Sequence, residues 1–401
     1  MQQAVQQVSV LKESAIRHPQ PQATGYEAHF ARLLGVEGKA FAFWKGRVAL
    51  FAILKALGIG EGDEVIVPAF TCVVVPNAIR FTGATPVYAD ITPHTYHVDP
   101  GRVERLIGRR TRALLIQHTY GVPADLEALL DLAAQRQIPV IEDCCHALGS
   151  TFQGQPLGTF GTAAFFSSQW SKPFTTGLGG MAVTRSECLA EKLQEQQALF
   201  AQPSRLAQWK LFLMFQIFQR FFSPQLYWRA YDILQRLSRL GLFVGSSGAD
   251  ELSGELPRDH QWRMADLQQA TGVQQLDRLR RAIQTRRSLA GLYDQELARA
   301  GWGPTGRTGE TILLRYPVRV GNKLELLDRA RQARVELGAW FETPLHPTPL
   351  ERHANFGYQL GQAPQSEQAA GQVVNLPLHS RVTEEEAQRI VKFFIEHAAE
   401  A

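Results

Sequence analysis

Apolar and polar positions alternate along residues 38–185 in a pattern that predicts a sheet covered by helices. Residues 47–57, "RVALFAILKAL", carry apolar side chains at helical spacing, and Gly58 supplies the glycine signal that ends a helix. Residues 124–137 repeat the helical pattern. Short apolar runs bounded by turn residues predict strands at 64–68, 86–90, 113–118, 139–143, 162–166 and 181–184. Strands that alternate with helices predict an α/β fold built on a mostly parallel sheet.

The rest of the chain is expected to add an arm and a smaller unit. Residues 1–27 are polar and lack the apolar core of a signal peptide, so we expect an irregular arm. Beyond about residue 290, a strand-like stretch at 311–320 and a helix-like stretch at 325–337 predict a second α/β unit. The expected organisation is therefore an arm at 1–37, a large domain at 38–289 and a small domain at 290–401.

The glycine-rich string "GIGEGD" at residues 58–63 does not indicate a dinucleotide site. It follows a predicted helix and precedes a predicted strand, which is the reverse of the dinucleotide-binding order, and its glycine spacing also differs. We expect a turn.

Composition narrows the possible functions. The 401 residues carry a formal charge of +4, an excess too small and too evenly spread to indicate a nucleic-acid partner. The cysteines are Cys72, Cys144, Cys145 and Cys188, which form neither a disulfide framework nor a C-x-x-C metal site. We therefore expect a protein of the reducing cytoplasm with no bound metal.

The stretch "FFSSQWSKPFTTGLGG", residues 165–180, places one lysine, Lys172, where a predicted strand runs into polar and glycine residues. A lone lysine in a loop is usually a solvated surface residue. The alternative is an amine nucleophile, which needs partners elsewhere in the chain.

Candidate partners stand at the ends of other predicted elements. Asp143 ends the strand at 139–143, and His146 follows three residues later, on the same side of a helical turn. Gly46 and Arg47 begin the helix at 47–57, where free backbone N–H groups and the helix dipole attract phosphate. Ser167 adds a hydroxyl at a strand end. Each has an ordinary structural role as an alternative, but together they form the set that pyridoxal phosphate requires.

In the order and spacing of these segments the chain resembles the DegT/DnrJ/EryC1/StrS family of pyridoxal-phosphate-dependent sugar aminotransferases, which have the aspartate-aminotransferase-like fold. The resemblance covers nearly the whole chain and runs through residues 58–91, 118–184, 261–279 ("QWRMADLQQATGVQQLDRL") and 376–390 ("LPLHSRVTEEEAQRI").

The resemblance implies a role for each candidate. Lys172 matches the lysine that forms a Schiff base with the cofactor aldehyde, and Asp143 the carboxylate that pairs with the pyridine nitrogen. His146 stands where the family bonds the cofactor's ring oxygen. Ser167 and Gly46 match phosphate-binding groups.

The family further implies a homodimer with shared active sites and an amino donor that is glutamate or glutamine. Gln261 stands where the family has an Asn that reaches the cofactor phosphate from the other subunit.

Three cofactor-site positions depart from the family pattern. Arg47 replaces a hydroxyl residue and either holds phosphate or points elsewhere, and Cys72 replaces an aromatic residue that stacks on the cofactor ring. Gln261 is one methylene longer than Asn. His346 and His379 lie in segments that match family loops near the substrate opening, and a structural role is the alternative for both.

Residues 206–245 are rich in aromatic and aliphatic side chains and contain almost no acids. Their longest apolar run is far shorter than the ~20 residues needed to cross a bilayer. Three interpretations remain open: a buried helical pair or dimer interface, a helix lying on an anionic membrane, and a lid over a bulky substrate.

We therefore expect an aminotransferase that acts on a keto sugar, nucleotide-activated, for surface glycan or secondary metabolite biosynthesis. It would be cytoplasmic or peripheral at the inner face of the membrane. One alternative is a sugar dehydratase with the same cofactor, but the family's dehydratases have histidine in place of the lysine. The other is a catalytically silent partner that recruits a glycan-assembly enzyme through residues 206–245.

Overall fold

The computed structural model describes residues 25–36, 39–221, 248–303 and 310–398. The helices of this part are α2 (Tyr26–Leu34), α3 (Gly46–Ala56), α4 (Val74–Arg80), α5 (Pro100–Leu106), α6 (Leu126–Gln135), α7 (Glu187–Leu199), α8 (Arg205–Phe221), α10 (Ala249–Ser253), α11 (Asp266–Arg299), α12 (Lys323–Gln332), α13 (Pro364–Gln372) and α14 (Glu384–Ala398), with 3₁₀ turns at Thr119–Gly121 and Leu350–Phe356. The strands are β1 (Ala40–Phe43), β2 (Glu64–Pro68), β3 (Thr71–Cys72), β4 (Thr85–Ala89), β5 (Thr111–Gln117), β6 (Val140–Asp143), β7 (Thr151–Phe152), β8 (Gln155–Pro156), β9 (Ala163–Ser167), β10 (Gly180–Val183), β11 (Tyr316–Arg319), β12 (Leu345–His346) and β13 (Val373–Leu376).

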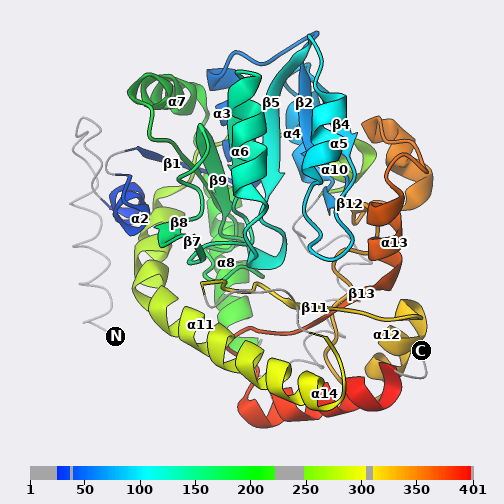
Figure 1. The fold of residues 1–401 in the computed structure, drawn as a ribbon. Coiled ribbons are helices and arrows are strands. Elements are labelled where there is room, and N and C mark those ends of the chain that lie inside the picture. Colours follow the sequence, from blue (N-terminus) through cyan, green and yellow to red (C-terminus); the bar gives the residue numbers. More distant parts are fainter. Residues whose placement is uncertain (1–24, 37–38, 222–247, 304–309, 399–401) are drawn as a thin grey trace, which may run out of the picture.

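A seven-stranded sheet in the order β1-β10-β9-β6-β5-β2-β4 forms the centre of the larger part (Figure 1). The neighbours from β9 to β4 pair in parallel, and β10 runs antiparallel to both β9 and β1. The six strands expected from the sequence are β2, β4, β5, β6, β9 and β10, and residues 58–63 form the expected turn between α3 and β2. The expected α/β fold with a mostly parallel sheet is confirmed.

Helices cover both faces of this sheet, which is why its strands are apolar on both sides. One apolar core joins the sheet to α3, α4 and α7, and the other joins it to α2, α6 and α11. The carboxyl ends of β5, β6 and β9 therefore meet at one edge of a layered sheet, between elements that fix their positions.

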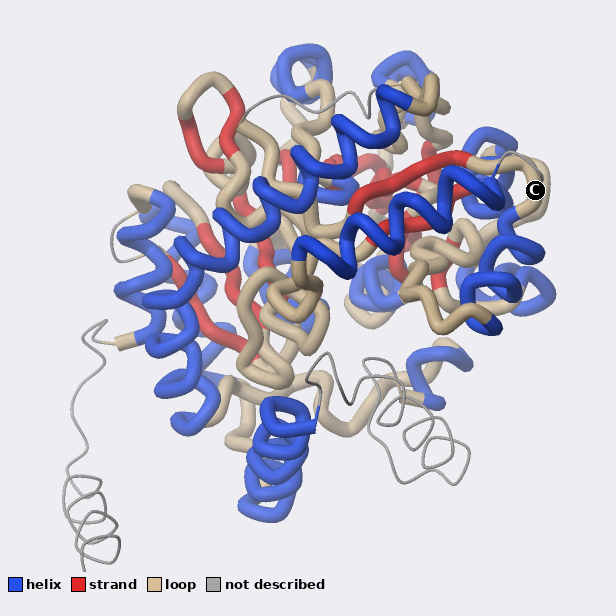
Figure 2. Tube along the Cα trace, turned by 90° about the horizontal axis from the view of Figure 1, so that it is seen from below, coloured by secondary structure: helices blue, strands red, loops and turns tan. Residues whose placement is uncertain are grey.

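The 34-residue helix α11 leads from the large sheet to a smaller unit made of β11, β13, α12 and α14. Figure 2 shows α11 and α14 packed side by side, and their apolar faces enclose a separate core. The domain boundary expected at residue 290 falls inside α11, so the proposed domain division stays a prediction.

Of the expected irregular arm at residues 1–27, the structure describes 25–27, and the prediction is wrong for Tyr26 and Glu27, which begin α2. Tyr26 and Phe30 are buried, and Phe30 packs against Phe166 of β9 with ring centres 5.0 Å apart. The helix is thus stabilised by tertiary packing, which its polar flanks did not indicate.

The apolar segment at 206–245 is described only as far as Phe221, where it forms α8. Leu211 and Phe215 of this helix are buried, whereas Leu206, Trp209, Leu213 and Ile217 remain exposed on its other side. The continuation of the segment lies outside the described residues. In the described part of the chain, no helix combines the length and the apolar character needed to cross a membrane.

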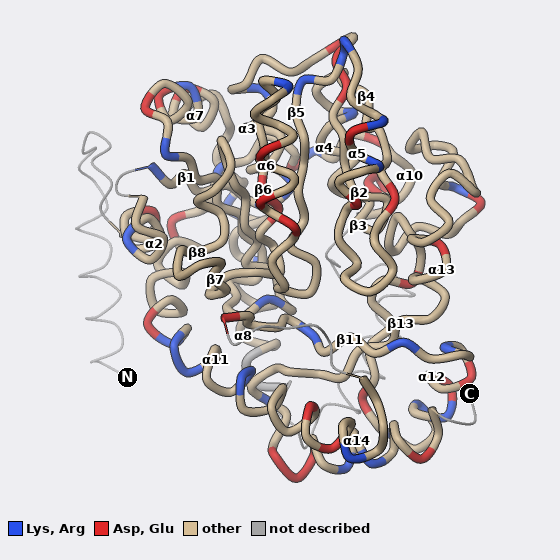
Figure 3. The backbone as a smooth tube through the Cα atoms, viewed as in Figure 1, with Lys and Arg blue, Asp and Glu red and all other residues tan. Residues whose placement is uncertain are grey.

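Charged residues of both signs are interspersed along the outer elements, including α11, α12 and α14 (Figure 3).

Candidate active site

A cavity opens at the edge where the parallel strands end. Asp143 and Ser167 are the last residues of β6 and β9, Cys72 is the last residue of β3, and Gly46 is the first residue of α3. The cavity is lined by Gly46, Arg47, Cys72, Val74, Val75, Gln117, Asp143, Cys145, His146, Phe165, Ser167, Gln169, Ser171, Lys172, Trp340, Phe341, His346 and Pro347. All but one of the predicted cofactor-site residues thus share one cavity; the exception is Gln261.

Lys172 stands in the turn after β9, where its backbone N–H donates to the Gln169 carbonyl oxygen at 3.0 Å. Its Nζ lies 4.9 Å from the centre of the Trp340 ring. Burial lowers the pKa of Lys172 below its ordinary value, and the positive charge of Arg315 acts in the same direction, against the opposing effect of Asp143. A larger share of the amine is therefore neutral and nucleophilic at neutral pH.

Asp143 is a buried carboxylate whose Oδ1 accepts the backbone N–H of Cys145 at 2.9 Å. Burial raises the pKa of Asp143, while that N–H and the charge of Lys172 act to lower it. The carboxyl group is thus held at a fixed place in the cavity, where a cationic partner would favour its ionised form.

The orientation of His146 follows from one hydrogen bond. The backbone N–H of Tyr120 donates to Nδ1 of His146 at 3.2 Å, so the neutral ring carries its proton on Nε2. Burial lowers the pKa of His146 well below its ordinary value, and the charges of Lys172 and Arg315 lower it further. His146 is therefore a neutral imidazole with a single N–H to donate.

The start of α3 forms a narrow cradle beside Ser167. No side chain caps this helix end, and Val48 and Ala49 donate their N–H groups to the Lys45 carbonyl oxygen. A methyl group added at Gly46 would lie 3.0 Å from Cβ of Ser167 and 3.2 Å from the Phe166 carbonyl oxygen. Glycine leaves this space open at the positive end of the helix dipole, which suits an anion.

The structure shows the surroundings of two residues that depart from the family pattern, Arg47 and Cys72. Arg47 lines the cavity, but its guanidinium pairs with the buried carboxylate of Glu251 on α10, so its charge is balanced within the chain. Cys72 is half-buried in the cavity wall, and burial raises the pKa of its thiol.

The third departure, Gln261, is exposed and does not line the cavity of its own chain. Its backbone carbonyl oxygen accepts the N–H of Ala201 at 2.9 Å, and its predicted contact with a partner's cofactor stays a prediction.

The sequence-based reasoning missed an aromatic wall from the small unit. The short strand β12 pairs in parallel with β3, and this pairing carries Trp340 and Phe341 into the cavity. The Trp340 and His146 ring centres lie 4.9 Å apart. The aromatic pair directly before "ETPLHPTPL" was the available signal, but the pattern along the chain does not show which strand β12 meets.

Of the two histidines considered as site candidates, the structure places only one in the cavity. His346 lines the cavity, and burial is the main reason that its pKa is lowered to about 3. His379 does not line it, and instead pairs through Nε2 with Glu336 at 2.9 Å beside a neighbouring cavity.

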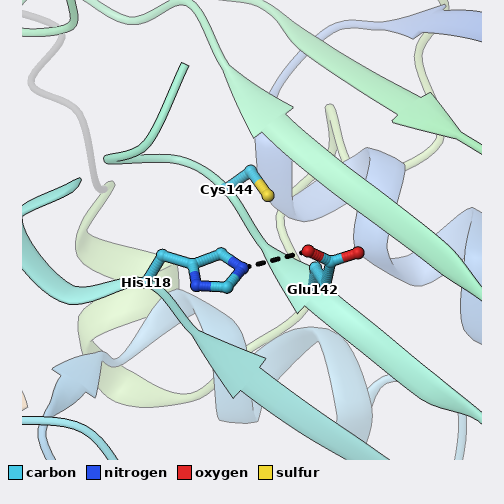
Figure 4. A group of neighbouring side chains, drawn as sticks. All are labelled: His118, Glu142 and Cys144. Atoms are coloured by element: carbon cyan, nitrogen blue, oxygen red, sulfur yellow. Dashed lines mark hydrogen bonds and ion pairs between the residues drawn. The ribbon is translucent and has the colours of Figure 1, made fainter. Parts of the chain in front are cut away.

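His118, Glu142 and Cys144 lie close together behind the active-site edge (Figure 4). His118 Nε2 bonds Glu142 at 3.0 Å, while its Nδ1 accepts the N–H of Ala124. The Glu142 oxygens also accept backbone N–H groups from Gly158, Phe160 and Gly161. With its hydrogen-bonding capacity used in this way, the group serves to fix the end of β6 and the loop at 158–161.

Comparison with known proteins gives a consistent result over most of the chain. The sequence profile of the DegT/DnrJ/EryC1/StrS aminotransferase family matches residues 1–212 and 229–394. GDP-perosamine synthase of Caulobacter vibrioides is 30% identical over 375 residues, which cover 91% of this chain and 87% of that protein. The spore coat polysaccharide biosynthesis protein SpsC of Bacillus subtilis is 28% identical over 396 residues, with 97% and 92% coverage. The solved structure of DesV from S. venezuelae is 27% identical with a TM-score of 0.71, covering 98% of this chain and 93% of DesV.

Proposed function

Because the chain belongs to the DegT/DnrJ/EryC1/StrS aminotransferase family, we propose that it uses pyridoxal phosphate to transfer an amino group to the keto group of a nucleotide-activated sugar. The observation that carries the proposal is the cavity that joins Lys172, Asp143 and His146 to the uncapped start of α3. An amine with a lowered pKa, a buried carboxylate, a neutral imidazole and an anion cradle are together the groups that this cofactor requires.

The residues present fit the cofactor. Lys172 would bind its aldehyde carbon, and Asp143 would hold a proton at its pyridine nitrogen. His146 would donate its Nε2–H to the ring oxygen. The phosphate would lie at the cradle of Gly46 and Ser167, where a side chain on residue 46 would close the space. Because Arg47 is paired with Glu251, the phosphate contacts assigned here come from backbone N–H groups and the Ser167 hydroxyl.

Each residue then has a definite task. When bound, pyridoxal phosphate supplies a ring that withdraws electrons from the substrate carbon that loses or gains the amino group. Lys172, whose lowered pKa favours the neutral amine, would take the proton from that carbon and return it to the C4′ carbon of the cofactor. Asp143 keeps the ring nitrogen protonated, so that the ring can accept electron density. Trp340 and Phe341 close one wall of the cavity and exclude water.

The names of the relatives support the sugar acceptor. GDP-perosamine synthase and L-glutamine:scyllo-inosose aminotransferase are among the similar proteins, the latter 44% identical over 153 residues that cover 38% of this chain. We assign the amino donor as glutamate or glutamine, and the product to surface glycan or secondary metabolite synthesis.

The assembly we propose is a cytoplasmic homodimer with shared sites. Gln261 is exposed and does not line the cavity of its own chain, which supports a role in the partner's site. The exposed apolar side of α8, formed by Leu206, Trp209, Leu213 and Ile217, suits the subunit interface among the three interpretations of this segment.

The test is a single-turnover reaction. The protein loaded with pyridoxal phosphate is mixed with glutamate and no acceptor, and the 2-oxoglutarate released is measured. We expect about one equivalent per active site, as in a ping-pong reaction, and none from Lys172→Ala. If the wild-type protein releases no keto acid from glutamate or from glutamine, the proposed function is wrong.

A further inference from the structure

A second cavity adjoins the first and shares Ser171 and Lys172 with it. It lies between the turn that carries Lys172, the end of α8, and the small unit. Among the residues that the structure describes, the charged side chains along its wall, apart from Lys172 and His379, are Arg286, Arg315, Arg381 and Glu336. Three guanidinium groups thus face one carboxylate in a space that opens beside the reactive amine.

Glu336 does not neutralise this wall. Burial alone would raise the pKa of Glu336, but its hydrogen bond to His379 and the charges of Arg315 and Arg381 outweigh that effect and hold the pKa below its ordinary value. Glu336 is therefore ionised and supplies a single negative charge. The described part of the wall therefore keeps a net positive charge, which favours an anionic ligand.

Arg286 is committed to the protein backbone. It is buried, and its Nη1 donates to the carbonyl oxygens of Leu313 and Leu314 at 3.2 and 2.6 Å. These bonds fix the chain immediately before Arg315, so Arg286 positions Arg315 rather than serving as the main contact for a ligand.

Arg315 lies next to the reacting centre. Its Cζ is 4.8 Å from the centre of the Trp340 ring, which itself lies 4.9 Å from Nζ of Lys172. The charge of Arg315 reaches Lys172, His146 and His346, three groups that line the first cavity. Arg381 lies further along the wall, with its Cζ 5.0 Å from the centre of the Phe218 ring on α8.

We propose that Arg315 binds a carboxylate group of the amino donor and of the keto acid formed from it, an inference that rests on the proposed function. A guanidinium matches the two oxygens of a carboxylate in a bidentate pair. The α-carboxylate of an amino acid is attached to the carbon that loses the amino group, so its binding site must open directly beside Lys172, as this cavity does. The diphosphate of a nucleotide sugar carries the same anionic oxygens, but a sugar ring separates it from the keto carbon.

The test measures binding to the protein loaded with pyridoxal phosphate, without turnover. Glutarate, an unreactive dicarboxylate, and inorganic pyrophosphate are titrated separately by calorimetry into the wild type and into Arg315→Gln, Arg315→Lys and Arg331→Gln. Arg331 is an exposed arginine on α12 and serves as the matched control. Circular dichroism and the melting temperature establish that each variant is folded.

We expect glutarate affinity to fall at least about tenfold in Arg315→Gln, the loss of a charge-assisted hydrogen-bonded pair. Arg315→Lys keeps the positive charge but loses the bidentate geometry, so its glutarate affinity should lie between those of the wild type and Arg315→Gln. Arg331→Gln should bind glutarate as tightly as the wild type. Pyrophosphate affinity should be the same in all four proteins. Unchanged glutarate affinity in Arg315→Gln overturns the proposal, and so does a wild type that binds no glutarate. If Arg315→Gln loses affinity for pyrophosphate but not for glutarate, Arg315 binds the diphosphate of the acceptor sugar instead. That result also overturns the proposal.

This outcome is separable from failure of the proposed function. If the proposed function is wrong, wild-type protein releases no keto acid from either donor. If only the role of Arg315 is wrong, the wild type still releases keto acid from glutamate, and Arg315→Gln binds glutarate as tightly as the wild type does.

Discussion

Glu142 and Asp143 are consecutive carboxylates at the end of β6, and the strand sends them to different surroundings. Asp143 lines the cavity, whereas Glu142 is enclosed by His118 and the loop at 158–161. At the scale of single residues, the position along the strand therefore decides which carboxylate faces the cavity and which is enclosed by hydrogen-bond donors.

Because Asp143 and Glu142 have different surroundings, replacing each carboxylate by its amide should have a different effect. Asp143→Asn should lower the rate of amino transfer by about 10²–10³-fold, since it removes one fixed charge from the reacting centre. Its free energy of unfolding should change little, because the amide oxygen can still accept the Cys145 N–H. Glu142→Gln should instead lower the free energy of unfolding by about 1–3 kcal/mol, because its NH₂ group would face backbone donors. Single-turnover rates and urea unfolding measure the two effects, and equal effects of both variants on rate would contradict the account.

Much of the residue set was predictable and part of it was not. Lys172, Asp143, His146 and Ser167 follow strands of one sheet, and the carboxyl ends of parallel strands share an edge, so their proximity could be inferred. Trp340 and Arg315 come from the small unit. Their approach depends on the pairing of β12 with β3 and on the bonds of Arg286, which leave no periodic signal in the sequence.

At the scale of elements, α3 is held at the active-site edge by a buried ion pair to α10. The pair joins Arg47 at the start of α3 to Glu251, whose backbone carbonyl oxygen also accepts the side-chain N–H of Asn77 on α4 at 2.8 Å. Arg47, which departs from the family pattern, is thus paired with an acidic residue, Glu251, that follows the apolar segment at 206–245 in the sequence.

Breaking this pair should be costly. Glu251→Gln should lower the free energy of unfolding by about 3–5 kcal/mol, since it removes the charged partner of the buried Arg47, whereas the double variant Arg47→Met/Glu251→Leu should recover most of that loss. Urea denaturation of the two variants measures this. A double variant less stable than Glu251→Gln would show that the residues do not act as a pair.

Strands were predicted correctly where the local pattern of apolar residues determines the structure. The apolar runs between turns became β2, β4, β5, β6, β9 and β10, because strands buried on both faces are continuously apolar. Tyr26 and Glu27 were expected to be irregular, and they begin α2 because Tyr26 and Phe30 bury their rings against distant elements. Such long-range packing is not visible in a polar N-terminal segment.

At the scale of the whole molecule, the proposed dimer makes each active site depend on two chains. In a mixed dimer of Lys172→Ala and Gln261→Glu subunits, the site that keeps Lys172 would receive the unaltered Gln261 from its partner. Each variant alone should be inactive, the second because a carboxylate would repel the cofactor phosphate.

Unfolding the two variants together and refolding the mixture should restore activity. Random pairing of subunits in a C2 dimer limits the recovery to about a quarter of the wild-type value. Gln155→Glu, at an exposed position on β8, is the control and should be active alone. No recovery in the mixture would contradict a site shared through Gln261.

The central claim is that Lys172 is the residue that holds the cofactor, and covalent mapping tests it most directly. The protein is incubated with pyridoxal phosphate, reduced with borohydride and digested, and the modified peptide is identified by mass spectrometry. We predict one pyridoxyl group per chain on Lys172, and none on the same peptide of Lys172→Ala. A cofactor attached to a different lysine, or no attachment in the wild type, would contradict the account.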